Sequence, residues 1–266
     1  YEALHAPGGV LRYGIPEFRL PNAILDWEID VLRQRGVEIV TNVIVGKTIA
    51  LDDLLNDMGF AAAFIGTGAG LPRFLGIPGE NLNGVFSANE FLTRINLMRA
   101  YDFPVADTPM KVGKRVAVIG AGNTAMDTVR SSMRMGAEKG LIVYRRSETE
   151  MTARIEEYHH AIEEGVEFHW LTNPIEVLGN DEGWVTGLKC QVMELGEPDE
   201  SGRARPVPVA GSEFVIEVDN VVLSIGTTPN PLLLQSTPGL ETDRWGCLVA
   251  DQEFGRTTRP RIYAGG

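Results

Sequence analysis

The chain has 266 residues, 30 of them glycine, and a formal charge of −12 at pH 7. This length can bury one large core or two medium ones. The negative charge argues against a nucleic acid or an anionic membrane as the main partner. Cys190 and Cys247 form no CxxC pair, which excludes a local redox disulfide motif, a zinc knuckle and an iron–sulfur cysteine motif. No apolar stretch approaches about 20 residues and no signal-peptide pattern is present, so we expect a cytoplasmic protein.

The first hundred residues alternate between helix and strand patterns. Residues 20–36 place apolar side chains at helical spacing and end at a glycine, which predicts a helix. Residues 37–45, "VEIVTNVIV", indicate a strand or a strand pair, and residues 60–70 predict a strand buried on both faces that ends in glycines. A second helix is predicted over 87–101, because Ser87 and Glu90 have capping-box spacing.

The stretch "VAVIGAGNTAMD" has the pattern of a phosphate-binding turn. A four-residue apolar strand precedes Gly120, and Gly122 and Ala125 complete a G-x-G-x-x-A spacing. The glycines allow a sharp turn and a close approach of the backbone to a pyrophosphate, which the amides at the helix start then face. The helix that follows ends at Gly136, and a second strand, "LIVY", comes next. The predicted turn consists of Gly120, Ala121, Gly122, Asn123 and Thr124.

Two arginines follow the second strand, where an acid would bind the ribose hydroxyls of NAD. Arg145 and Arg146 suit a dianionic 2′-phosphate instead, because guanidinium groups make paired, charge-assisted contacts to phosphate oxygens. We therefore predict NADP(H); the alternative is a pair of surface arginines at a strand end. Arg154, at the next helix, either reaches the same phosphate or pairs with Tyr158 or Glu157.

The second half changes character and then returns to the first pattern. Residues 184–218 contain short β-like stretches separated by an exposed turn, "LGEPDESGRA", which predicts an antiparallel excursion. Residues 218–230 repeat an apolar strand followed by Gly-Thr, as at residues 60–67, so we expect two related domains. Glu2 is placed like the ribose-binding acid of another Rossmann strand, whose glycine turn would lie some 20 residues upstream.

Six motifs in order carry a family resemblance: "EALHAPGGVLRYGIPEFRLP", "FIGTGAG", "VAVIGAGNTAMD", "VYRRSETEM", "ELGEPDESGR" and "YAGG". Together they resemble the glutamate synthase small (beta) subunit group, which includes the flavin subunit of NADH-dependent ferredoxin:NADP oxidoreductase, also described as sulfide dehydrogenase. The resemblance implies an α/β, two-dinucleotide-binding, Rossmann-like flavoprotein fold in which an NADPH domain interrupts an FAD domain. It also implies hydride transfer from NADPH to FAD, and then electron transfer through iron–sulfur clusters to a partner subunit.

Carried over by position, the resemblance divides the chain into 1–82, part of the FAD domain, 83–227, the NADPH domain, and 228–266, the return to the FAD domain. The family's FAD glycine turn, cluster cysteines and last flavin helix have no counterpart in this sequence. We therefore expect a complete NADPH domain, an incomplete FAD domain with at most weak FAD binding, and no activity from this stretch alone. The residues assigned to FAD are Glu2 at the ribose, Gly8, Gly9, Leu11 and Gly14 near the flavin, Val45 at the adenine, Thr67 near the domain crossing, Gly226 at the return, and Gly265 and Gly266 in the closing motif.

Two classes of function remain open at this point. The first is a flavin-dependent NADPH oxidoreductase that serves glutamate synthesis with a large subunit, or alternatively feeds ferredoxin or a sulfur substrate. The second is a non-catalytic NADP(H)-binding module. Hydride transfer needs orientation more than acid–base chemistry, so we predict no catalytic side chain. His159 and Glu163 have metal-compatible spacing, but without an HExxH pattern a solvated acidic helix face is the prediction, with no metal.

Overall fold

The computed structural model describes residues 1–200 and 202–266. The chain forms two compact units. The first unit contains residues 1–9, 23–72 and 226–266, and the second contains residues 10–22 and 73–225. The second unit thus begins at Arg73 and ends at Ile225, where the sequence had favoured 83 and 227 as limits of the inserted domain.

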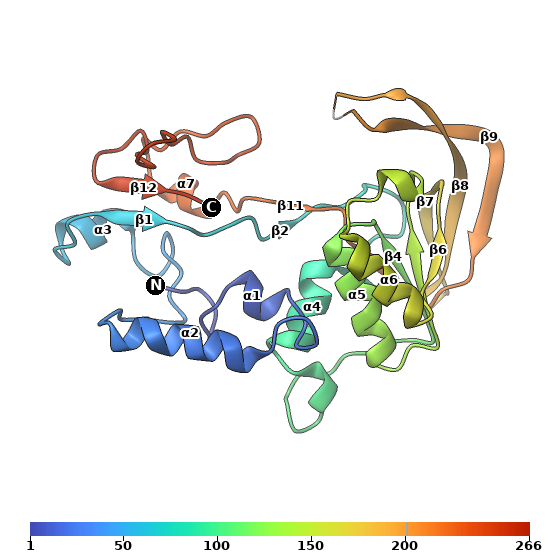
Figure 1. The fold of residues 1–266 in the computed structure, drawn as a ribbon, viewed down its shortest axis with the longest axis horizontal. Helices are drawn as coiled ribbons and strands as arrows, with labels where there is room; N and C mark the ends of the chain where they lie inside the picture. Colours follow the sequence, from blue (N-terminus) through green and yellow to red (C-terminus); the bar gives the residue numbers. More distant parts are fainter. Residues whose placement is uncertain (201) are drawn as a thin grey trace. The chain divides into compact units, whose positions relative to one another are not determined.

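A five-stranded parallel sheet forms the centre of the second unit (Figure 1). Its order is β3-β10-β4-β5-β6, and every neighbouring pair is parallel. The strands span Val85–Ser87 (β3), Asn220–Leu223 (β10), Arg115–Ile119 (β4), Lys139–Val143 (β5) and Glu167–His169 (β6). All four residues of β10 and the last four of β4 and of β5 are buried, as a parallel sheet covered on both faces requires.

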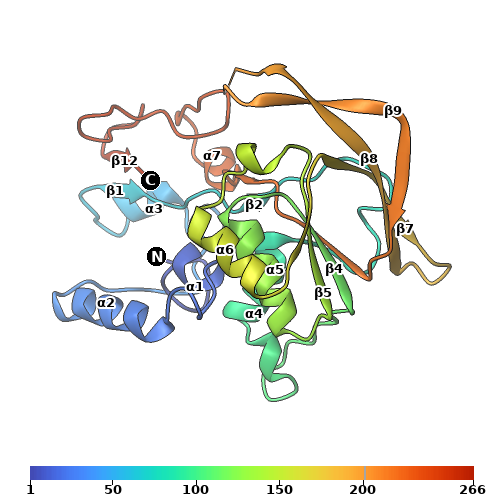
Figure 2. The same cartoon turned by 45° about the vertical axis from the view of Figure 1, so that its right-hand side comes forward.

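Helices cover one face of this sheet, and Figure 2 shows α5 and α6 in front of β4 and β5. Val116 and Val118 of β4 pack into a core with Ala125, Met126 and Val129 of α5. The helices of the second unit are α1 (Val10–Tyr13), α4 (Ala88–Asn96), α5 (Asn123–Arg134) and α6 (Ile155–Glu163), with short 3₁₀ turns η1 (Ala100–Asp102) and η2 (Glu148–Glu150). Ser87 caps α4 by accepting a hydrogen bond from the Glu90 amide at 3.1 Å, as predicted.

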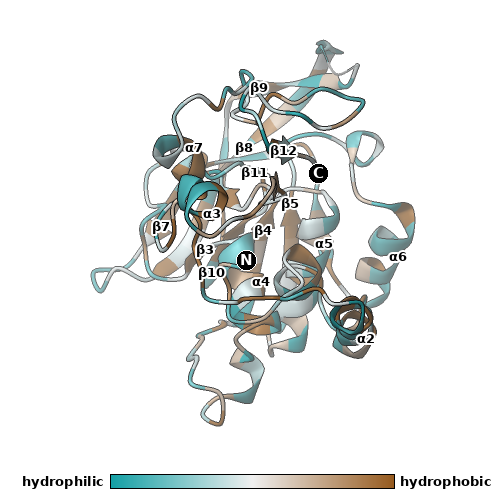
Figure 3. Ribbon diagram, turned by 90° about the vertical axis from the view of Figure 1, so that its left-hand side faces the viewer, coloured by the Kyte–Doolittle hydropathy of each residue, from teal (hydrophilic) through white to brown (hydrophobic). Residues whose placement is uncertain are grey.

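An antiparallel sheet covers the other face. It has the order β7-β8-β9 and spans Thr172–Gly179, Val185–Pro198 and Ala204–Ile216. Ala117 and Ile119 of β4, which alternate with the residues that face the helices, pack against this layer together with Leu188 and Cys190 of β8. The predicted antiparallel excursion is confirmed, and the apolar colouring of the central strands in Figure 3 agrees with a sheet enclosed between two layers.

The first unit has smaller elements. β1 (Ala63–Ile65) pairs in parallel with β12 (Ile262–Ala264), and β2 (Leu71–Pro72) pairs with β11 (Thr227–Thr228) in antiparallel fashion. The helices are α2 (Asn22–Gln34), α3 (Leu51–Asn56) and α7 (Leu232–Ser236). Leu51, Leu54, Leu55, Ile65, Leu233 and Ile262 form the buried core of this unit.

Three predictions about elements were wrong in part. Residues 37–45 form no strand beyond an isolated Val45–Ile49 bridge, and Asn42 adopts a positive φ of 60° that interrupts an extended chain. β1 is only three residues long, and its Phe64 is 70% exposed rather than buried on both faces. The helix predicted over 87–101 ends at Asn96. No described helix is both long and apolar enough to cross a membrane.

Candidate functional site

The turn between β4 and α5 lies at the point where the strand order of the parallel sheet reverses. β4, β5 and β6 follow one another to one side, and the chain then returns to place β10 on the other side of β4. Open α/β sheets bind ligands at the carboxyl ends of strands at such a switch point. Gly120 makes the turn with a φ of +127°, and a Cβ there would lie 2.3 Å from the carbonyl oxygen of Ser224, which follows β10. Glycine is therefore required at position 120 by both backbone conformation and space.

The amino terminus of α5 is open to an anion. Gly122 is the N-cap residue and offers no side-chain acceptor to the first amides of the helix, those of Asn123 and Thr124. Amides without a partner and the positive end of the helix dipole together favour a phosphate group. The predicted turn thus fits a dinucleotide diphosphate, which the backbone of residues 120–124 would hold.

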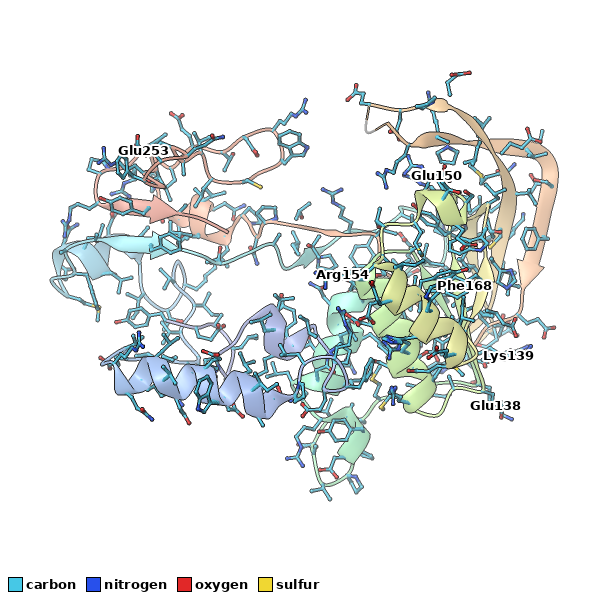
Figure 4. All side chains as sticks on the ribbon, viewed as in Figure 1. Glu138, Lys139, Glu150, Arg154, Phe168 and Glu253 are labelled. Carbon is cyan, nitrogen blue, oxygen red and sulfur yellow. The ribbon has the colours of Figure 1, made fainter. Side chains whose placement is uncertain are left out.

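The segment before α6 is attached to this turn. The amides of Thr152 and Ala153 donate to the Ala121 carbonyl at 3.2 and 3.0 Å. Asn123 accepts a hydrogen bond from the Arg154 amide through Oδ1 at 2.8 Å, so its side chain fixes the start of α6. The Arg154 side chain is exposed (Figure 4) and makes no hydrogen bond or ion pair with the described part of the chain. The amides of Glu157 and Tyr158 donate to the Arg154 carbonyl at 3.1 and 3.2 Å.

The two arginines that follow β5 have different environments. Arg145 is exposed, and its guanidinium has no hydrogen bond or ion pair within residues 1–200 and 202–266. The side chain of Arg146 is 6% exposed; its Nε donates to the Ala204 carbonyl at 2.9 Å, and Nη2 forms an ion pair with Asp199. Sequence reasoning missed Asp199 and Ala204, because they lie more than 50 residues from Arg146 and no local spacing connects them.

Hydrogen bonds also fix the loop that carries these arginines. The Tyr144 hydroxyl donates to the Glu150 carbonyl at 2.9 Å, and the Ser147 amide donates to the Glu150 carboxylate at 3.1 Å. The hydrogen bond from the Ser147 side chain lowers the pKa of Glu150, so the Glu150 carboxylate that accepts these bonds is ionised at neutral pH. These hydrogen bonds hold the loop that follows β5.

A buried ion-pair network joins α5 to α6 and to the segment that contains Arg19. Asp127 accepts two hydrogen bonds from Nη1 of Arg19, at 2.9 and 2.7 Å, and Arg19 also pairs with Glu157 of α6 at 3.0 Å. Arg130 of α5 extends the network to Glu157 at 2.7 Å. Burial raises the pKa of Asp127 to about 6, although the Arg19 guanidinium partly opposes the shift. No spacing in the sequence predicts this network, because it joins three segments distant in the chain.

The residues assigned to FAD are divided between the two units. Glu2, Gly8, Gly9, Val45, Thr67, Gly226, Gly265 and Gly266 lie in the first unit, whereas Leu11 and Gly14 lie in the second. One carboxylate oxygen of Glu2 accepts the Leu4 amide at 2.9 Å, and Thr67 and Gly265 follow the paired strands β1 and β12. The Gly265 amide donates to the Ile65 carbonyl at 3.2 Å. The structure thus brings Thr67 and Gly265 to one end of the first unit.

The histidines of α6 and the two cysteines are the remaining titratable candidates from the sequence. His159 and His160 are exposed, and no group of three potential metal ligands occurs among the described residues. Burial raises the pKa of the Cys190 thiol to about 12, so it stays protonated and unreactive at neutral pH. Cys247 is exposed and belongs to the other unit.

Comparisons with known proteins identify the family of the chain. A family model described as pyridine nucleotide-disulphide oxidoreductase matches residues 32–266. NADP(+)-dependent formate dehydrogenase subunit beta of Moorella thermoacetica is 40% identical over 268 residues, which cover 100% of this chain and 36% of the relative. Glutamate synthase [NADPH] small chain of Halomonas elongata is 38% identical over 97% of this chain and 55% of the relative. The chain therefore spans about half or less of these relatives, and its resemblance to the glutamate synthase small-subunit group is confirmed.

Among solved structures, Mycobacterium tuberculosis FprA in complex with NADPH matches with a TM-score of 0.78 at 22% identity. The match covers 99% of this chain and 70% of the FprA chain. This likeness confirms the α/β dinucleotide-binding fold. With the family model covering all but the first 31 residues, the assignment rests on nearly the whole chain. The chain belongs to the pyridine nucleotide-disulphide oxidoreductase family.

Proposed function

We propose that this chain binds NADP(H) at the β4–α5 turn and belongs to a flavin-dependent oxidoreductase. The observation that carries the proposal is the combination of an uncapped helix terminus at the switch point of the sheet with an exposed Arg145 at the end of the next strand, whose side chain has no partner in residues 1–200 and 202–266. The helix terminus suits a diphosphate and the arginine suits a 2′-phosphate. Two relatives whose names contain NADPH or NADP(+) support the same cofactor.

The roles of the residues follow from their positions. Gly120, Ala121, Gly122, Asn123 and Thr124 would hold the diphosphate with backbone amides. Arg145 and Arg146 would bind the 2′-phosphate, the first with a free guanidinium and the second from an anchored position, and Arg154 would add charge from the start of α6. Bound NADPH would supply a hydride and bound FAD its acceptor. The protein's contribution is orientation and exclusion of water, so no side chain is assigned as a general acid or base.

In the first unit, the resemblance assigns Glu2, Gly8, Gly9, Val45, Thr67, Gly226, Gly265 and Gly266 to FAD, with Leu11 and Gly14 on the adjoining segment. One oxygen of Glu2 is engaged by the Leu4 amide and its other oxygen is available for a ribose hydroxyl. The closeness of Thr67 and Gly265 at the ends of β1 and β12 also suits a nucleotide at the carboxyl ends of parallel strands.

The electron acceptor belongs to the whole protein. A glutamate synthase large subunit, reached through iron–sulfur clusters, is the first candidate, because relatives named as its small chain match 97% of this chain. A different partner is the second candidate, because a formate dehydrogenase subunit matches equally well. A ferredoxin-type acceptor or a sulfur substrate remains within the same class of reaction.

The proposal is tested by mixing the full-length flavin-loaded protein with NADPH and with NADH under anaerobic conditions and following flavin absorbance. We expect rapid bleaching with NADPH and slow bleaching with NADH. Binding of NADPH without any bleaching would support the non-catalytic nucleotide-binding module instead. Equal rates with the two nucleotides would contradict the assigned preference.

A further inference from the structure

The tip of the β8–β9 hairpin reaches the candidate 2′-phosphate site. Both hairpin strands extend well past the part of β8 that pairs with β7, as Figure 2 shows, and Pro198 of β8 pairs with Ala204 of β9 next to the tip. Asp199 is fixed there, because its amide donates to the Arg203 carbonyl and its carbonyl accepts from the Gly202 amide, both at 2.9 Å. The hairpin thus presents one carboxylate and one carbonyl to Arg146.

These contacts occupy only one edge of the Arg146 guanidinium. The group has five N–H donors; Nε serves Ala204 and Nη2 serves Asp199, so Nη1 and the other Nη2 proton remain. Among the described residues, the only fully buried side-chain nitrogen or oxygen atoms without a hydrogen-bond partner are the hydroxyl oxygens of Ser131 and Thr237. Nη1 of Arg146 has no partner among the described residues and is not one of these buried atoms, so it reaches the surface of the molecule.

We propose that Asp199 is a positioning residue for nucleotide selection: it fixes Arg146 so that the free edge of the guanidinium faces the 2′-phosphate of NADP(H). This inference rests on the proposed NADP(H) function and adds the hairpin tip to its specificity. Arg145 contributes charge but has no side-chain partner in the described part of the chain. Arg146 has a fixed orientation, because Asp199 and Ala204 restrict its side chain. A guanidinium held in advance loses less conformational freedom when it binds phosphate.

The counter-charge also has an energetic reason. The side chain of Arg146 is 6% exposed, and a charge removed from water to that extent needs a partner. Without Asp199 the guanidinium would leave its position for solvent or lie buried and unpaired, and in either case its free edge would no longer meet the phosphate. NADH has no 2′-phosphate, so its binding does not depend on this contact.

The test is calorimetric titration of Asp199→Ala with NADPH and NADH, and with 2′,5′-ADP and AMP as probes that lack the nicotinamide. We expect the Kd values for NADPH and 2′,5′-ADP to rise roughly tenfold, as for one lost charge-assisted contact, and those for NADH and AMP to stay unchanged. Unchanged NADH binding also shows that the variant is folded. Asp199→Asn, which keeps an acceptor of the same shape, should fall between Asp199→Ala and the unmodified protein.

Glu197→Ala is the matched control, because Glu197 is an exposed acid of the same hairpin, two residues away. It should leave all four Kd values unchanged. In an Arg146→Ala background, Asp199→Ala should have no further effect, as expected of a residue that acts through the arginine. An NADPH preference that is undiminished in Asp199→Ala, or tighter NADPH binding, would overturn this inference alone; an unmodified protein without any NADPH preference would overturn the proposed function itself.

Discussion

Arg145 is the side chain that contributes most directly to the proposed choice of nucleotide, because its guanidinium is exposed and unengaged by the described residues. We expect Arg145→Ala to cost about 2 kcal/mol of NADPH binding free energy, or roughly thirtyfold in Kd, because charge-assisted hydrogen bonds to the 2′-phosphate would be lost. NADH affinity should change little. Calorimetric titration with both nucleotides measures the effect.

Lys139→Ala is the matched control for this prediction. Lys139 is a cation at the opposite end of β5, where it pairs with Glu167 at 3.2 Å (Figure 4). Its removal changes the net charge by the same amount but does not touch the candidate site. If both variants weakened NADPH equally, general electrostatic attraction would account for the loss and Arg145 would have no specific role.

Asp127 gives a prediction about pH. Its folded-state pKa is raised to about 6 from an ordinary value of 3.8, so the folded protein takes up a proton before the unfolded chain does as the pH falls. Stability therefore rises as the pH falls through this window, and Asp127 contributes about 2 kcal/mol more at pH 4 than at pH 7. Asp127→Asn lacks this contribution. Urea unfolding of both proteins at the two pH values tests it: the difference between them should change with pH, and a constant difference would contradict the assignment.

At the residue scale, sequence and structure agree where the function depends on local spacing. The glycines of the turn and the adjacent arginines are recognisable because a phosphate-binding turn and a strand end have fixed offsets along one chain. Asp199 and Arg19 were not recognisable, since each meets its partner across 53 and 108 positions. Long-range ion pairs have no sequence period, and only the folded chain shows that Arg145 and Arg146 differ.

The β4–α5 element depends on Gly120 for its shape. We expect Gly120→Ala to destabilise the protein by about 3 kcal/mol, because alanine meets both a strained φ and a Cβ placed 2.3 Å from the Ser224 carbonyl. Gly136→Ala, at the other end of the same helix, is the control: its φ is +103°, but no atom lies within 4 Å of the new Cβ. Its cost should be nearer 1 kcal/mol. Equal shifts of the two melting temperatures would show that the close strand approach contributes nothing.

The type and bounds of a helix or strand were predicted best where its apolar side chains are buried in the core. β4, α5, β5 and β10 lie in or on a sheet covered on both faces, and their patterns gave the correct type and near-correct bounds. Residues 37–45 have a strand-like composition but lie outside any sheet, and Asn42 with a positive φ breaks the extended conformation. Helix 87–101 was predicted too long because Leu97 to Tyr101 continue an apolar pattern past the true end at Asn96.

At the scale of the whole molecule, the chain forms two units. The second unit contains the five-stranded parallel sheet and consists of residues 10–22 and 73–225, and the first unit is assembled from three separate stretches. The prediction of two related domains came from the repeated strand–Gly–Thr pattern, and the family model spans both units. Sequence alone places segment 10–22 with the rest of residues 1–82, whereas in the structure it groups with residues 73–225, although parts of the first unit flank it on both sides. Its membership depends on contacts such as Arg19 with Asp127, which only the structure reveals.

The central claim is that the β4–α5 turn and the arginines after β5 select the phosphorylated nucleotide. Calorimetric titration of the unmodified protein with NADPH and then with NADH tests it most directly. The account predicts one NADPH site per chain and an affinity for NADH at least about thirtyfold weaker, as the loss of the 2′-phosphate contacts implies. Equal affinities for the two nucleotides, or tighter binding of NADH, would contradict it.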